Sequence, residues 1–341
     1  MMVRLRQLSL LFVLLLEVLL PTELFTQAEL KTVGTHFYYG NQPFPYTGIS
    51  FFNAIYNDEF ATEGESRRIW LQKFNSYGVN VLRVWAQWDN DRGFVNTCDT
   101  CSLITADGNI RPSYLTRIKA ILADMQREGM IMQLVLFSHE SIHKYELLGR
   151  ENAINAVRQI STELLPFRNL FFQVWNEHSA DVLDHLKAIK AIDSNRLVTN
   201  SPGFAGNLGS TEQNSQLDFL TPHTSRQNVG AHWRVGPKEI AYLLERYGKP
   251  VVDDEPARNG TSNFGGPKKP TTPFDQIAQI LAVWNEGGYI TYHHDMFQLG
   301  SSGASTPPSG IPDPEFNPYH HQIFQLLKVK DRFMHTQTTS H

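Results

Sequence analysis

Two glutamates follow apolar stretches and are candidates for acid–base and nucleophilic chemistry. Glu177 comes directly after the segment NLFFQVWN, and Glu255 ends the segment PVVDDE. Cleavage of a glycosidic bond requires one carboxyl group that holds a proton for the leaving oxygen. It also requires a second carboxyl group that stays ionised and attacks the anomeric carbon. Glu177 and Glu255 could supply both groups if the fold brings them to one site.

A rival arrangement of nearby residues would bind zinc. The segment HESIH matches the H-E-x-x-H motif, in which His139 and His143 on one helix face bind the metal and Glu140 is the general base. Glu177 and Asp181 have the spacing of the third ligand and its supporting aspartate in gluzincin proteases, which they resemble. The segments that precede His139 and Glu177 are apolar and rich in β-formers, which disfavours the required helices. A zinc metalloprotease therefore stays as an alternative, and the favoured interpretation needs no metal and no cofactor.

The elements that must position these residues alternate along the chain, with short apolar runs between longer amphipathic stretches. Strand-like runs lie at 47–52, 80–85, 130–137, 169–175, 196–200, 218–222, 250–255 and 288–294. The clearest helix-like stretches lie at 66–78, 112–129, 151–167, 237–248 and 274–288. This order predicts an α/β fold, a closed (β/α)8 TIM barrel in a single domain, with a doubly wound open sheet as the alternative. Residues 201–216 have no helical period and are expected to form a rim loop.

In such a barrel the active site lies at the C-terminal ends of the strands. Polar residues expected at that rim are Arg83, His139, Asn176, Glu177, His223, Glu255 and His293. Candidates for an aromatic sugar platform are Trp85, Trp88, Trp233 and Tyr292. Glu177 and Glu255 belong to the fourth and seventh strand-like runs, so we expect them at one mouth about 5 Å apart, the separation that retains configuration at the cut carbon.

Two aspartates stand directly before Glu255. Strand alternation predicts that Asp253 shares a face with Glu255, one layer deeper in the barrel, and that Asp254 points to the other face. Neighbouring carboxylates raise each other's proton affinity, so Asp253 is expected to be neutral or paired with a buried cation. Glu255, rather than either aspartate, is the predicted nucleophile.

The segments WNE at 175–177 and GKPVVDDE at 248–255 resemble those of clan A of the glycoside hydrolases, which contains the family five cellulases and mannanases. The segments DDEPARNG and GGYITYHH are also similar to those of outlying, apiosidase-like barrels of this clan. The resemblance implies a retaining hydrolase with Glu177 as acid/base and Glu255 as nucleophile. Asn176 would bind the sugar 2-hydroxyl.

The same resemblance implies that Arg83 hydrogen-bonds the nucleophile and that His139 and His223 line the sugar subsite. In the clan, a tyrosine two residues past the histidine of strand six usually contacts the nucleophile, and here Ser225 occupies that place. The tryptophan of strand eight is missing as well. A barrel that binds sugar without cleaving it is therefore a further alternative.

Composition limits the partners and the compartment. Residues 1–28 combine early arginines with the apolar run LSLLFVLLLEVLL and are predicted to be a signal peptide, leaving 29–341 as the catalytic domain of a secreted or periplasmic protein. A net charge of −4 with scattered Lys and Arg disfavours nucleic acid, so the expected partner is a carbohydrate, without membrane contact after cleavage. Cys98 and Cys101 are expected to form a local disulfide.

Overall fold

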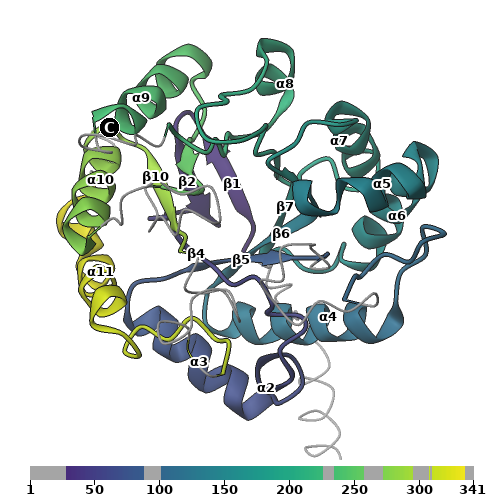
Figure 1. The fold of residues 1–341 in the computed structure, drawn as a ribbon, viewed down its shortest axis with the longest axis horizontal. Coiled ribbons are helices and arrows are strands. Elements are labelled where there is room, and N and C mark those ends of the chain that lie inside the picture. Colours follow the sequence, from purple (N-terminus) through teal and green to yellow (C-terminus); the bar gives the residue numbers. More distant parts are fainter. Residues whose placement is uncertain are drawn as a thin grey trace, which may run out of the picture.

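The computed structural model describes residues 28–87, 101–225, 234–256, 272–294, 307 and 309–334. At its centre, seven parallel strands pair in the order β8-β7-β6-β5-β4-β10-β9 (Figure 1). They are β4 (Thr47–Ser50), β5 (Val81–Trp85), β6 (Ile131–Ser138), β7 (Leu170–Asn176), β8 (Val198–Thr199), β9 (Val252–Asp253) and β10 (Tyr289–Tyr292). All of their residues are buried, as expected for a parallel sheet that is covered on both faces.

Residues 218–222 close the ring between β8 and β9. The amide of Asp218 donates to the carbonyl of Val198 at 3.1 Å, and the amide of Leu220 donates to the carbonyl of Pro250 at 3.0 Å. The amide of Val252 in turn donates to the carbonyl of Leu220 at 2.9 Å. This short segment is the eighth strand position, so the predicted (β/α)8 barrel is confirmed.

Helices surround the strands (Figure 1). They are α2 (Asp58–Ala61), α3 (Gly64–Ser76), α4 (Pro112–Arg127), α5 (Ile142–Leu148), α6 (Arg150–Glu163), α7 (Val182–Lys190), α8 (Thr211–Gln216), α9 (Gly236–Tyr247), α10 (Pro273–Asn285) and α11 (Pro318–Lys328). Two 3₁₀ turns lie at His139–Ser141 and Lys330–Arg332. In α4, Ile118, Ile121, Leu122 and Met125 form one buried stripe at helical spacing. The predicted rim loop over 201–216 is wrong at its end, where the Ser210 side chain caps α8.

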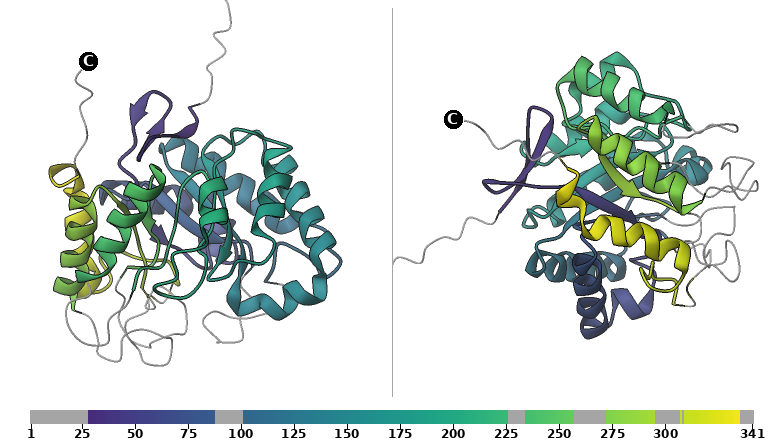
Figure 2. Two further views of the ribbon diagram at one scale, coloured as in Figure 1. Left: turned by 90° about the horizontal axis from the view of Figure 1, so that it is seen from above. Right: turned by 90° about the vertical axis from the view of Figure 1, so that its left-hand side faces the viewer.

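A small antiparallel sheet, which the sequence analysis did not predict, covers the N-terminal end of the barrel. It consists of β1 (Leu30–Val33), β2 (His36–Tyr39) and β3 (Gln42–Pro43), and Figure 2 shows it projecting from one end of the molecule. Its residues Leu30 and Phe37 join a buried cluster with Val81, Ile131 and Phe171 from the first residues of three barrel strands. Apolar packing therefore seals the end of the barrel away from the candidate site.

The layer above this apolar floor is polar. Tyr46 donates its hydroxyl hydrogen bond to Gln133 at 2.7 Å, and Gln133 Nε2 donates to Asp254 Oδ2 at 3.0 Å. Gln173 accepts from Arg83 Nε at 3.0 Å and donates to Ser201 at 2.6 Å. These side chains are hydrogen-bonded to one another, as polar groups in a buried layer must be. This network fixes the positions of Arg83 and Asp254, which lie toward the C-terminal end of the barrel.

Two sequence predictions lie partly outside the described residues. The predicted signal peptide at 1–28 overlaps them only at residue 28, and it stays a prediction. Among the helices that the structure describes, none has the length and apolarity that crossing a membrane would require. Cys101 is disulfide-bonded, whereas Cys98 is not among the described residues.

Candidate active site

Glu177 and Glu255 meet at the C-terminal mouth of the barrel with His223 between them. His223 Nδ1 lies 3.0 Å from Glu177 Oε1, and His223 Nε2 lies 3.5 Å from Glu255 Oε1. One carboxylate oxygen from each glutamate and one ring nitrogen lie within 4.8 Å of one another. All three side chains are buried. The two carboxyl groups therefore have the close spacing expected of a retaining pair rather than the wider gap that admits a water between them.

Arg83 joins the nucleophile candidate to its neighbours. Its Nη1 lies 3.2 Å from Glu255 Oε1, and its Nη2 donates to Asn176 Oδ1 at 2.7 Å. Its Nε lies 2.9 Å from Asp254 Oδ2. The rigid guanidinium fork can hold three acceptors at fixed angles, so Arg83 positions Glu255 and Asn176 relative to each other.

The predicted faces of the two aspartates are wrong. Asp254 points into the barrel toward Arg83, whereas Asp253 points outward and accepts hydrogen bonds from Thr224 at 2.9 Å and Gln279 of α10 at 2.8 Å. The strand β9 ends at Asp253 and the chain bends at the next two residues, so the alternation of side chains does not extend to Glu255. Asp254, not Asp253, is the carboxylate paired with a buried cation.

Burial dominates the protonation of both aspartates. It raises the pKa of Asp253 to about 6, against the opposing effect of the hydrogen bonds from Thr224 and Gln279. Burial also raises the pKa of Asp254, and the positive charge of Arg83 opposes that shift. The expectation of an elevated proton affinity for Asp253 is therefore confirmed, although its cause is burial and not the neighbouring carboxylates.

His293 approaches the second oxygen of Glu255, with 3.6 Å between His293 Nε2 and Glu255 Oε2. A hydrogen bond of 2.9 Å between His293 Nδ1 and Ser50 Oγ orients the ring from β4. Tyr292, predicted as part of the sugar platform, is fully buried and its hydroxyl lies 2.7 Å from His320 Nδ1 of α11. That prediction is wrong, because adjacent residues of an extended chain face opposite sides and the inward position belongs to His293, the residue directly after β10.

The other predicted platform residues are distributed differently. Trp85 is buried beneath the mouth, with the Arg83 guanidinium carbon 4.5 Å from its ring centroid and Phe52 packed at 4.6 Å. Trp85 therefore supports the arginine and does not offer an open surface. Trp88 and Trp233 are not among the described residues.

An aromatic edge that the sequence analysis did not identify borders the acid/base side of the mouth. Phe204, which is 52% exposed, packs edge-on against His139 with 4.7 Å between ring centroids, and His139 lies 5.9 Å from the ring of His178. Exposed phenylalanine next to two imidazoles offers a stacking surface for a sugar ring. Phe204 follows β8 in a segment rich in glycine and serine, where no strand-end pattern singled it out.

Backbone strain is concentrated at the acid/base candidate. Glu177 has a φ of +60°, a left-handed conformation that side chains with a Cβ rarely adopt. The chain turns there directly after β7, which aims the carboxyl group toward His223 rather than outward. Strained residues of this kind persist where the surrounding structure fixes them and are frequent in active sites.

The zinc motif is not assembled. His139 directly follows the long strand β6 and opens a 3₁₀ turn, whereas His143 lies exposed in α5, so the two imidazoles do not share one helix face. Glu177 and Asp181 both precede α7, which begins at Val182, and so they do not have the required helical spacing either. Within the described part of the chain, the cluster with metal-ligand geometry is Glu177, His223 and Glu255.

Ser225, at the position of the clan's tyrosine, does not face the nucleophile. Its backbone amide donates to Glu239 Oε2 of α9 at 2.6 Å, and its hydroxyl bonds to the same carboxylate. His223 and His293 instead contact the two oxygens of Glu255 from strand positions six and eight. The nucleophile candidate is therefore fixed by two imidazoles and one guanidinium.

Comparisons with known proteins agree with this architecture. The fold is that of glycoside hydrolase (β/α)8 barrels: a putative glycoside hydrolase from Bacteroides vulgatus superposes with a TM-score of 0.66 at 18% identity, covering 91% of this chain and 62% of that one. The β-mannanase of the blue mussel Mytilus edulis gives a TM-score of 0.58 at 15% identity, covering 90% and 97%.

In sequence, the chain is 23% identical over 219 residues to a mannan endo-1,4-beta-mannosidase of Cryptopygus antarcticus. That match covers 58% of this chain and 54% of the relative, so the chain spans about half the length of the curated relative it matches. No family model matches the sequence. The resemblance to clan A barrels predicted from the sequence is confirmed.

Proposed function

We propose that this protein is a retaining glycoside hydrolase that cleaves O-glycosidic bonds of a polysaccharide or oligosaccharide by double displacement. The observation that carries the proposal is the pair Glu177 and Glu255, whose oxygens lie within 4.8 Å at one barrel mouth. The fold shared with glycoside hydrolase barrels supports the same conclusion.

In the first step, Glu255 attacks the anomeric carbon while Glu177 gives its proton to the leaving oxygen. The glycosidic bond breaks, and an ester bond between the sugar and Glu255 forms. In the second step, Glu177 removes a proton from water, whose oxygen attacks the same carbon and releases Glu255. Two inversions give net retention, and Glu177 ends protonated as it began. This cycle consumes only water and requires no cofactor.

His223 is placed to couple the two protonation states. A neutral imidazole has one donor and one acceptor nitrogen. With its proton on Nε2, His223 accepts a hydrogen bond from protonated Glu177 at Nδ1 and directs its donor toward ionised Glu255. After Glu177 has lost its proton and Glu255 is esterified, the tautomer of His223 with its proton on Nδ1 matches the site, because it can donate a hydrogen bond to ionised Glu177. One imidazole can therefore serve both halves of the cycle.

The substrate class is also part of the proposal. The relatives with mannanase names make β-1,4-mannan the first substrate to test, and the exposed Phe204 next to His139 and His178 supplies a surface on which a sugar ring can stack. Asn176, held by Arg83, is placed to contact the 2-hydroxyl of the sugar bound to the nucleophile.

The test is a panel of β-mannan, β-glucan, β-xylan and activated aryl glycosides, with the anomeric configuration of fresh product read by NMR. We expect retention for every substrate that is cleaved. Glu177→Ala and Glu255→Ala should each abolish turnover of natural substrates, and azide should rescue Glu255→Ala as a glycosyl azide of inverted configuration. A product of inverted configuration from the parent protein would refute the double displacement.

The second candidate function is a barrel that binds sugar without cleaving it, and it is favoured by Ser225 at the place of the clan's tyrosine. Binding of mannan or glucan with no turnover across the whole panel would support this candidate over the hydrolase.

We further propose that the protein is exported and loses residues 1–28, on the strength of the N-terminal sequence alone. N-terminal sequencing of protein secreted by its own host cell, or by a related one, tests this. A mature chain that still begins at Met1 would contradict it.

A further inference from the structure

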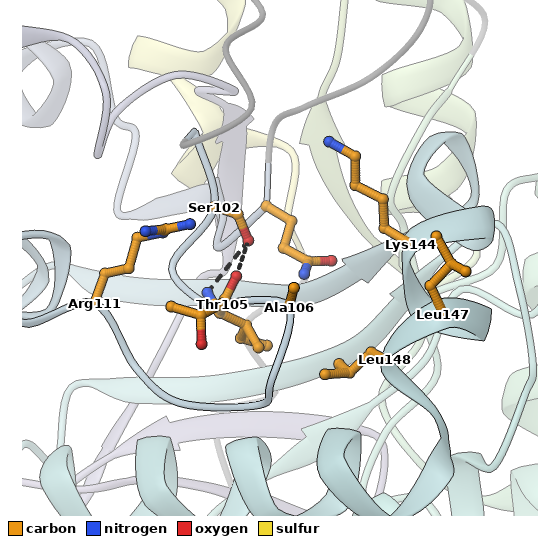
Figure 3. A pocket seen from close by; sticks show the side chains of 9 residues that line it. Ser102, Thr105, Ala106, Arg111, Lys144, Leu147 and Leu148 are labelled. Carbon is orange, nitrogen blue, oxygen red and sulfur yellow. Dashed lines mark hydrogen bonds between the residues drawn. The ribbon is translucent and has the colours of Figure 1, made fainter.

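A pocket of about 350 Å³ lies between the segment that follows β5 and the helix α5 (Figure 3). Its described lining residues are Gln87, Ser102, Ile104, Thr105, Ala106, Arg111, Lys144, Leu147 and Leu148. A volume of this size accommodates a sugar unit, since ligand pockets begin at about 300 Å³. None of the chemistry proposed above uses these residues.

Arg111 is the unusual member of this lining. It is half-buried, and its guanidinium makes no hydrogen bond or ion pair with any part of the chain that the structure describes, while Nε is inaccessible to solvent. Other buried arginines of this protein are paired, as Arg67 is with Asp124 and Arg83 with Asp254. Leaving a buried donor of a charged group unsatisfied is unfavourable, so Arg111 is kept at a cost. The two Nη groups of the half-buried side chain have no partner in the described chain and are available to an acceptor in the pocket.

The charged residues of the described lining are both cations. Lys144 lines the side opposite Arg111 in the view of Figure 3, and no carboxylate is among the described lining residues. The side-chain amide of Gln87 is a further polar group of this lining. Two cations and an amide form a suitable set of donors for a carboxylate or sulfate group.

The apolar part of the lining suits the remainder of a sugar. Leu147 is 84% exposed, which is unusual for a large apolar side chain, and Leu148 lies next to it. An apolar surface beside a few placed polar groups is the usual composition of a site for a small organic ligand. An inorganic anion would make no favourable contact with the two leucine side chains, whereas the carbon atoms of a sugar ring would.

The pocket lies on the same side of the barrel as the glutamate pair, because its lining segments follow the C-terminal ends of β5 and β6. Gln87 lies two residues after Trp85, which packs against Arg83, and Lys144 follows His139 by five residues. The strands that these segments follow, β5 and β6, are neighbours in the sheet. A glycan bound across the mouth could therefore place a further sugar unit here.

From these contacts we infer that the pocket is a subsite for a sugar unit with a negatively charged substituent, either the carboxylate of a uronic acid or a sulfate ester. The inference rests on the proposed function for the rest of the glycan, and it deepens that function by assigning an anionic glycan as the substrate. Arg111 is the main contact for the charge, with Lys144 as a second cation.

The experiment compares binding to three derivatives of one backbone: carboxymethyl, sulfated and neutral hydroxyethyl β-1,4-glucan. Affinity electrophoresis is carried out with the Glu177→Ala protein, which should not hydrolyse the glucan. The carboxymethyl and sulfated glucans carry the same number of charges per sugar unit, so a difference in binding between them distinguishes a carboxylate ligand from a sulfate ligand. We expect an anionic derivative to bind at least about tenfold more tightly than the neutral one, equivalent to about 1.4 kcal/mol. Arg111→Gln should remove most of that preference and Lys144→Gln part of it.

Arg68→Gln is the matched control, because Arg68 is exposed on α3 and its substitution changes the net charge by the same amount. Arg111 makes no side-chain cap to α4, so the Gln variant should fold, which equal unfolding midpoints would verify. Equal binding of anionic and neutral derivatives, or a loss in Arg68→Gln equal to that in Arg111→Gln, would overturn the inference. Failure of hydrolysis with intact, Arg111-dependent binding would instead refute only the proposed function.

Discussion

Asp254 Oδ2 lies 2.9 Å from Arg83 Nε, and Nη1 of the same guanidinium lies 3.2 Å from Glu255 Oε1. Both partners are fully buried, and Asp254 also accepts a hydrogen bond from Gln133. A buried pair of this kind fixes geometry more than it adds stability, because the cost of removing two charges from water offsets much of their attraction. Asp254 therefore determines where the guanidinium points, and through it the position of Glu255, the proposed nucleophile.

The first prediction concerns that role. Asp254→Asn should lower kcat by about 10- to 100-fold, because the Arg83 fork loses its fixed anionic partner. KM should change less, since the sugar-contacting groups remain. Asp253→Asn is the matched control: it makes the same chemical change one residue earlier, on the outer side of β9. Equal losses in the two variants would show that Asp254 does not position Arg83.

His223 should be required for the chemical step. In His223→Gln, the Gln side chain has no second ring nitrogen with which to contact Glu177 and Glu255 at the same time. It also cannot exchange its donor and acceptor atoms as the two glutamates change protonation state, so kcat should fall by about 100- to 1,000-fold. His36→Gln, at the opposite end of the barrel, should leave kcat unchanged. Single-turnover kinetics would show whether the rate of glycosylation or the rate of deglycosylation is lowered. Unchanged rates of both steps would contradict the proposed role of His223 between Glu177 and Glu255.

Ser50 should act through His293. Ser50→Ala removes the hydrogen bond that orients the ring, and we expect a loss of about threefold to tenfold in kcat/KM, consistent with one neutral hydrogen bond of about 1 kcal/mol. His293→Ala should cost more, because the contact with Glu255 is lost as well. A double variant no worse than His293→Ala alone would confirm that serine works only through the histidine, whereas additive losses would contradict it.

Asp253 should make folding stability depend on pH. Its pKa is about 6 in the folded protein, against 3.8 for an ordinary aspartate, so between pH 4 and 6 the folded state binds more protons than the unfolded chain. Stability contributed by this group is therefore present at low pH and decreases as the pH rises through that window. Asp253→Asn cannot ionise, so its stability relative to the parent should increase by up to roughly 3 kcal/mol from pH 4 to pH 7. Chemical denaturation at both pH values measures this, and a constant difference would refute it.

The split H-E-x-x-H motif leads to a further prediction. Because His143 is exposed on α5 and His139 lies in the preceding 3₁₀ turn, His143→Ala should leave glycoside turnover within about twofold of the parent, as expected for an exposed surface change. His139→Ala should instead raise KM, because that ring packs against Phe204 at the mouth. Stoichiometric zinc that is lost on replacing His143 would contradict the assignment.

Most of the fold could be predicted from the sequence, because the buried parallel strands appear as short apolar runs and the covering helices as longer amphipathic stretches. All eight strand positions correspond, and Glu177, Glu255, His223, Arg83 and Asn176 meet as the resemblance implied. The N-terminal sheet was not predicted, since β1 and β2 are only four residues long and partly exposed. The apolar residues of β1 and β2 indicate a covering sheet only when the barrel is already known, because it is the apolar end of the barrel that they cover.

The errors within the site have a different cause. The faces of Asp253 and Asp254 were predicted by counting back from Glu255, and this failed because the chain bends after β9 at a point that no residue pattern indicates. Tyr292 was assigned to the mouth by its type, whereas the face of β10 is decided by register with β4 and β9. The pocket around Arg111 combines the segment after β5 with the helix α5, and an irregular segment carries no periodicity from which such a meeting could be inferred.

The left-handed backbone of Glu177 bears on the history of the protein as well as on its chemistry. Glycine would adopt that conformation without steric cost, so natural selection for persistence of the folded chain alone favours glycine at position 177. If Glu177 has the proposed acid/base role, a descendant that no longer hydrolyses glycosides should drift toward Gly or Asn at this position and become more stable. The residue at position 177 in a lineage would then record whether hydrolysis is still under selection.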